Sequence, residues 1–120
     1  MFCFCNLTPH AIVIHHATGV VTIPPFGPVA RVTTVPGPVD TIEVDGAMIT
    51  VAGATRFGPV VDLPPPSDGL FYIVSALVGG HRDVAGVRQD VLVPGTGPND
   101  GAVRDAAGKI IGVTRLNRVA

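Results

Sequence analysis

The chain has 120 residues, of which 47% are hydrophobic and 14% charged, and its formal net charge is −1. This length accommodates one modest hydrophobic core, so we expect a single β-rich domain over residues 1–120. The high apolar content argues against disorder, although glycine and proline are abundant. The near-neutral charge leaves no basic face for phosphates, so a nucleic-acid polymer is not expected as a partner.

Membrane association is also not expected, because no apolar run approaches the roughly 20 residues of a membrane span and no signal-peptide pattern precedes the first strand. We therefore expect a cytoplasmic protein. Cys3 and Cys5 alternate with phenylalanines in an extended segment, where their Cα atoms would lie roughly 6.6 Å apart, near the upper limit for a disulfide. Free thiols are expected, and their C-x-C spacing matches no usual zinc pattern, so neither a metal nor a cofactor is predicted.

Short apolar runs recur about every ten residues between turn sequences, which is typical of a β sandwich or barrel. The first predicted hairpin covers Ala11–Ile23 and turns at residues 17–19. Prolines interrupt the pattern at residues 24–28, because proline cannot donate a backbone hydrogen bond. A strand is expected at Val29–Val35, in which Arg31 shares a face with Val29 and Thr33.

The strongest hairpin signal is Asp45-Gly46, which lies between the segments TIEV and AMITVA. A further strand is predicted at Phe57–Leu63, before three prolines. Leu70–Val78 combines β-forming residues with helical spacing, and we interpret it as a strand that gives way to a short helical turn near Ser75–Val78. It ends at Gly79-Gly80.

The last third of the chain is predicted to contain a loop at His81–Gln89, a short buried strand at Val91–Val93 and a closing hairpin. That hairpin pairs Ala102–Arg104 with Lys109–Arg115, and its turn places Gly108 in the left-handed conformation. The fold class predicted is mainly β, a small antiparallel β-barrel or sandwich with about eight to ten strands and at most one short helix. Because such a domain must cover its strand edges, we expect a homo-oligomer.

The segment Asp90–Arg104 is the first candidate binding loop. Its glycines, including Gly97, expose backbone N–H groups, Asn99 and Asp100 offer polar edges, and Arg104 follows closely. Such a nest with an arginine suits an anion. The alternative interpretation is an ordinary β connection in which residues 99–101 form a tight turn.

The second candidate is the motif Asn-Leu-Thr-Pro-His at residues 6–10, in which Asn6, Thr8 and His10 either contact a ligand or bond nearby backbone. No hydrolase signature accompanies His10, so catalysis is not expected. Arg82 and Arg88 are expected to form solvated surface pairs with Asp83 and Asp90. Aromatic residues able to stack on a planar ligand are Phe26, Phe57, Phe71 and Tyr72.

Several short motifs together resemble those of a group of small proteins of phages, prophages and actinobacteria. They are Asn-Leu-Thr-Pro-His (6–10), Ala-Arg-Val (30–32), Gly-Pro-Val-Val-Asp-Leu-Pro (58–64), Tyr-Ile-Val-Ser (72–75), Asp-Val-Leu-Val-Pro-Gly (90–95) and Val-Arg-Asp with Gly (103–108). The size and β-rich character are also similar to those of small phage proteins of the Thoeris anti-defence type, which sequester cyclic ADP-ribose or related nucleotide signals of host immunity.

The resemblance implies a non-catalytic protein that sequesters a phosphate-bearing adenine nucleotide in the bacterial host cell during phage infection. The residues expected to hold the ligand are Asn6, Thr8, His10, Arg31, Tyr72, Ser75, Gly97, Asn99, Asp100 and Arg104. Two alternatives are a small structural or assembly protein of a phage without a small ligand, and a small nucleotide hydrolase. The hydrolase would need His10 or His81 close to Asp90 or Asp100.

Overall fold

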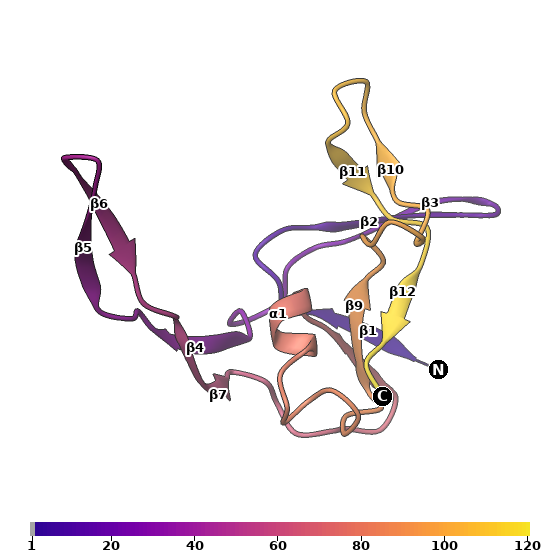
Figure 1. Ribbon diagram of the computed structural model, residues 1–120. Helices are drawn as coiled ribbons and strands as arrows, with labels where there is room; N and C mark the ends of the chain where they lie inside the picture. The colour runs from indigo at the N-terminus through magenta and orange to yellow at the C-terminus, as the bar shows by residue number, and fades with distance from the viewer. Residues whose placement is uncertain (1) are drawn as a thin grey trace.

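The computed structural model describes residues 2–120 and is mostly β, with twelve strands and one short helix in that range (Figure 1). The predicted β class with at most one short helix is confirmed. The strands do not close into a barrel. They form one four-stranded sheet and four separate two-stranded ribbons within the described residues.

The central sheet joins distant parts of the chain in the order β1, β8, β9, β12. Its strands are β1 (Cys3–Asn6), β8 (Leu70–Ile73), β9 (Val91–Pro94) and β12 (Leu116–Arg118). Only β9 and β12 pair antiparallel, whereas β1 with β8 and β8 with β9 are parallel. Parallel neighbours need a long crossover, and the crossover from β1 to β8 contains more than half of the chain. This central sheet is therefore mixed, whereas the four two-stranded ribbons are antiparallel, as expected for most of the domain.

The hydrophobic core lies on one face of this sheet, beneath the helix α1 (Ala76–Gly79) and the loop that follows it. Its buried members are Leu7, Ala30, Tyr72, Val74, Val78, Val84 and Val91. Ser75 caps α1, since its hydroxyl accepts a hydrogen bond from the backbone N–H of Val78 at 3.4 Å. The predicted helical turn after the Leu70 strand is thus confirmed.

The first and last hairpins form where the turn residues predict them, and they contact each other. They consist of β2 (Ile12–His16) with β3 (Gly19–Ile23), and β10 (Val103–Arg104) with β11 (Ile110–Gly112). Gly108 has a φ of 86° in the turn between β10 and β11. The backbone of Val113 bonds that of Val13 and His15, which fixes β11 beside β2.

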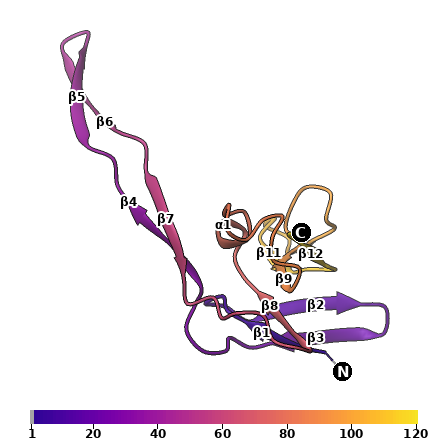
Figure 2. The ribbon, with the colours of Figure 1, turned by 90° about the horizontal axis from the view of Figure 1, so that it is seen from below.

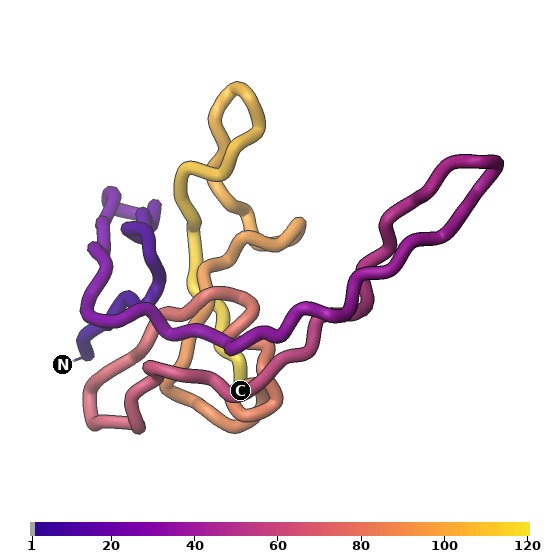
Figure 3. Tube along the Cα trace, turned by 90° about the vertical axis from the view of Figure 1, so that its left-hand side faces the viewer, coloured from indigo at the N-terminus to yellow at the C-terminus, as the bar shows by residue number. Residues whose placement is uncertain are grey.

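A long antiparallel ribbon, here called the arm (residues 31–61), projects from the core. Its base pairs β4 (Arg31–Val35) with β7 (Arg56–Val61), and its outer half pairs β5 (Val39–Val44) with β6 (Ala47–Ala52). The predicted turn is confirmed, since Asp45 and Gly46 both have positive φ, 49° and 81°. Figures 2 and 3 show the arm extending away from every other element.

The arm makes the molecule long and leaves much of its surface uncovered. The radius of gyration is 18.1 Å, whereas a compact chain of this length has about 14 Å. The accessible surface is 7924 Å², against about 6,100 Å² for a compact monomer of this mass. Every residue of β5 and β6 is exposed. The surplus surface lies on a ribbon without a covering layer.

The single helix found in residues 2–120 is too short to cross a membrane.

Candidate functional site

The Asn6–His10 motif is a buried hydrogen-bond centre. Asn6 is fully buried, and its amide nitrogen donates to the carbonyl oxygens of His10 at 2.8 Å and Ile23 at 2.9 Å. Its side-chain oxygen accepts from the backbone N–H of Thr8 at 3.0 Å and from the Thr8 hydroxyl at 2.6 Å. The amide therefore joins the end of β1 to the end of β3. Both amide hydrogens of Asn6 are therefore engaged in hydrogen bonds within the chain.

Thr8 is likewise buried, whereas the ring of His10 is exposed. His10 lines a hollow of about 310 Å³ between β2 and β11, whose other walls are mainly apolar. These walls include Ile12, Val13, Ile110, Ile111 and Val113. Of the three polar side chains predicted in this motif, only His10 is free to contact another molecule.

The Gly95–Gly101 loop is held by Asp100 rather than opened toward an anion. One carboxylate oxygen of Asp100 accepts from the backbone N–H of Gly97 at 2.8 Å and from the amide of Asn117 at 3.1 Å. The other oxygen forms an ion pair with Arg115. The expected nest thus already contains a negative charge from the protein itself, which ties the loop to β12.

Two other predicted contributors do not bond that carboxylate. Asn99 is exposed, and the Arg104 guanidinium donates to the carbonyl oxygen of Gly108 at 2.9 Å within its own hairpin. The hydrogen bonds between Gly97 and Asp100 close the loop on itself, as the alternative interpretation of a tight turn in an ordinary β connection expects.

Arg31 and Ser75 do come together, at a hollow of about 270 Å³ between the base of the arm and α1. Its remaining walls are Pro9, Val29, Ala30, Val32, Leu77 and Val78. The guanidinium of Arg31 is exposed and forms no hydrogen bond or ion pair with the side chains or backbone of residues 2–120. A cation beside an apolar surface can bind an anionic group that carries a flat or apolar part.

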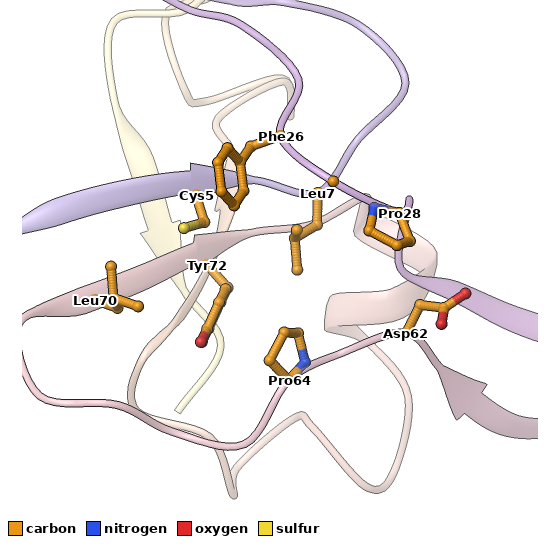
Figure 4. A pocket seen from close by; sticks show the side chains of 9 residues that line it. Cys5, Leu7, Phe26, Pro28, Asp62, Pro64, Leu70 and Tyr72 are labelled. Carbon is orange, nitrogen blue, oxygen red and sulfur yellow. The ribbon is translucent and has the colours of Figure 1, made fainter.

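Tyr72 belongs to a different cavity, of about 290 Å³, which Figure 4 shows from close by. The walls are apolar and consist mainly of Cys5, Leu7, Phe26, Pro28, Pro64, Leu70 and Tyr72. Phe26 is 65% exposed, as its glycine and proline neighbours predicted. Asp62 stands at the rim, and its carboxylate is unfavourable for a phosphate. This cavity suits an apolar or cationic group.

Arg88 and Asp90 form a closer pair than the sequence predicted. The guanidinium donates to both carboxylate oxygens, at 2.8 and 2.9 Å, and also to the carbonyl oxygen of Pro64 at 2.9 Å. Each side chain is 16% exposed, so the prediction of a solvated surface pair was wrong. The reason is the proline-rich loop at residues 64–66, which packs over the pair and which sequence spacing alone did not place there.

Among residues 2–120, the histidine and carboxylate combinations that the hydrolase alternative needs are not paired. Neither His10 nor His81 forms a hydrogen bond or ion pair with Asp90 or Asp100. His81 instead bonds the carbonyl oxygen of Gly58 at 2.9 Å, which attaches the base of the arm to the loop after α1. In the same range no group of three His, Cys, Asp or Glu residues could hold a metal ion.

No protein-family model, curated protein or solved structure matches this chain. The resemblance to phage proteins therefore stays an expectation from the motifs. The functional interpretation therefore depends on the geometry of the folded chain.

Replacement of Asn6 by leucine is expected to destabilise the fold strongly. The change leaves the buried Thr8 N–H without its acceptor and removes a donor from the carbonyls of His10 and Ile23, and a buried polar group left without a partner costs about 1–3 kcal/mol. We expect the free energy of unfolding to fall by about 3 kcal/mol or more in urea titrations. Asn99→Leu, at an exposed position, should change it by less than about 0.5 kcal/mol. Equal losses in the two variants would contradict a structural role for the motif.

Acid should weaken the fold through two carboxylates. Hydrogen bonds from Arg88 lower the pKa of Asp90, and the Gly97 N–H, the Asn117 amide and Arg115 lower the pKa of Asp100. A lowered pKa in the folded state gives stability that is complete above the unfolded-state value of about 4 and is lost as the pH falls through the folded-state value.

The urea midpoint should therefore fall as the pH decreases below about 4. The Asp90→Asn/Asp100→Asn variant should be less stable at pH 7 and should show a shallower loss in acid. A variant with the same acid slope as the wild type would refute this assignment.

Proposed function

We propose that the chain is a non-catalytic assembly protein whose arm is buried against a second copy of the chain. The observation that carries this proposal is the apolar face of the arm, defined as Ile42, Val44, Ala47, Ile49 and Val51. Cross-strand pairing places Ile42 opposite Ile49, Val44 opposite Ala47 and Val51 opposite Asp40, so these side chains lie on one side of the ribbon, with Asp40 as its single charged residue. Ile42 is 52% exposed and Ile49 is 49% exposed.

The opposite side of the ribbon is more polar and includes Thr41 paired with Thr50 and Glu43 paired with Met48. A strand pair with one apolar and one polar face is typical of a sheet that covers a hydrophobic layer on one side only. Here that layer is missing from the chain itself, because the arm points away from the core (Figure 2). An isolated two-stranded hairpin is at best marginally stable in water. A partner chain would supply the missing layer.

The uncovered area also fits assembly. The surplus of roughly 1,800 Å² over a compact monomer is of the order of the surface that specific protein interfaces bury. Further apolar residues are exposed beyond the arm, among them Phe2, Phe4, Val20, Phe26 and Ile111.

Two paired variants test the proposal. Ile42→Asp/Ile49→Asp places two carboxylates opposite each other on the apolar face, and Thr41→Asp/Thr50→Asp does the same on the polar face. We expect the first variant to lose self-association by at least about 100-fold, because burying an unpaired charge costs several kcal/mol. The control should associate like the wild type. Sedimentation velocity at micromolar concentrations measures both, after circular dichroism has confirmed the folded state. A strictly monomeric wild type would refute the proposal.

Sequestration of a nucleotide-derived signal is a second candidate, which the free guanidinium of Arg31 favours. It stands beside the apolar hollow that Ser75 and Pro9 also line, next to the Asn6–His10 motif. Together with the phage resemblance, this supports binding of a phosphate-bearing adenine nucleotide such as a cyclic ADP-ribose-type signal. The protein would retain the ligand without converting it.

Calorimetry with adenine nucleotides, cyclic nucleotides and ADP-ribose isomers tests this second candidate. Arg31→Ala should weaken binding by about 1.5–3 kcal/mol, the scale of a hydrogen bond to a charged group. Arg56→Ala, which removes another exposed arginine at the base of the arm, should leave binding unchanged. The absence of heat with every compound, or equal losses in both variants, would exclude this function at the Arg31 hollow.

A further inference from the structure

The outer half of the arm is acidic, whereas the C-terminal hairpin has a small excess of basic residues. In the outer half of the arm, residues 36–55, the charged residues are Asp40, Glu43 and Asp45, and lysine and arginine are absent. The hairpin of β10 and β11 carries Arg104, Lys109 and one acidic residue, Asp105, all of them exposed. Opposite charges on two separate surfaces of one chain favour contact between copies of that chain.

The basic hairpin also borders an apolar surface large enough to receive side chains. The hollow between β2 and β11, about 310 Å³ in volume, is lined by Ile12, Val13, Ile110, Ile111 and Val113, among others. Ile111 is 50% exposed. Apolar walls beside Arg104 and Lys109 match the combination of apolar face and acidic residues that the arm presents.

The other available surfaces fit the arm less well. At the Phe26 cavity the rim group is the carboxylate of Asp62, which would face the acidic residues of the arm. Two arms packed face to face would bring like charges together. Their contact would also cover only roughly 200 Å² on each side, since strands of six residues are about 20 Å long, whereas a standard interface buries about 800 Å² per partner.

We propose that the arm of one copy docks on the β2–β11 hollow and the basic β10–β11 hairpin of a second copy. This inference rests on the proposed assembly function and names the partner's surface. In a two-fold dimer each chain gives its arm and receives the other, so the contact is made twice and closes. The apolar face fills the hollow, and Asp40, which lies on that face opposite Val51, approaches Arg104 and Lys109.

The hollow is tested by Ile111→Asp, with Val87→Asp as the control at an exposed apolar position on the loop after α1. We expect Ile111→Asp to weaken self-association at least tenfold in sedimentation velocity and Val87→Asp to leave it unchanged. If Ile42→Asp/Ile49→Asp separates the copies but Ile111→Asp does not, the arm docks elsewhere, and this inference fails while the assembly function stands. A monomeric wild type would refute both this inference and the proposed assembly function.

Charge reversal tests the pairing of the two surfaces. Asp40→Lys and Arg104→Glu/Lys109→Glu should each self-associate at least tenfold more weakly than the wild type at low salt. Mixed in equal amounts, they should form a heterocomplex, because each then offers the charge that the other lacks. Unchanged self-association of the Arg104→Glu/Lys109→Glu variant, or a mixture in which no complex forms, would overturn the proposed contact.

Discussion

The structure depends on one limitation of a two-stranded ribbon, which is that it leaves both of its side-chain faces without a covering layer. Pairing of β5 with β6 satisfies backbone groups between the strands, but it provides no second layer for the side chains. Ile42, Val44 and Ile49 therefore remain in water although their spacing is that of a half-buried strand. The extended shape of the molecule and much of its exposed apolar surface follow from this uncovered face.

The position of the arm follows from the central sheet. Because β1 and β8 are parallel neighbours, the chain must leave the sheet and return to the same edge, and the arm forms in this crossover. Asn6 holds the start of the crossover by bonding the chain on both sides of the first hairpin. His81 holds its return through the carbonyl of Gly58. The polar groups of the motif thus serve to place the arm.

The charged residues that stabilise the fold differ from those that remain exposed on the arm. The carboxylates with lowered pKa, Asp90 and Asp100, are engaged by Arg88 and by Gly97, Asn117 and Arg115 within the core and its loop. Charged groups on the arm are exposed and have no ion-pair partner among residues 2–120. The first set stabilises the chain, and the second is available to a partner.

Local chemistry in the sequence determined the β class, the hairpin turns and the short helix after β8. The Asp45-Gly46 turn and the Ser75 cap need only a few adjacent residues, so the local sequence determines their conformations. The strand β12 was missed, because Leu116–Arg118 is short and is defined by its pairing with β9. The sequence also suggested polar site residues, but it did not show which of them would be engaged in hydrogen bonds within the folded chain.

Only the tertiary structure decided which of these residues remain free and where the hairpins point. Asn6 and Asp100 look alike in sequence as ligand-binding side chains, yet Asn6 is engaged by the backbone of Ile23 and Asp100 by the side chains of Arg115 and Asn117, all from other segments. Arg31 and Ser75 are far apart in the chain and meet because β4 lies against α1. The sequence determined the alternation of the arm, since side chains of a strand alternate at a fixed period. That its apolar face has no cover within the chain depends on long-range strand pairing, which no local pattern encodes.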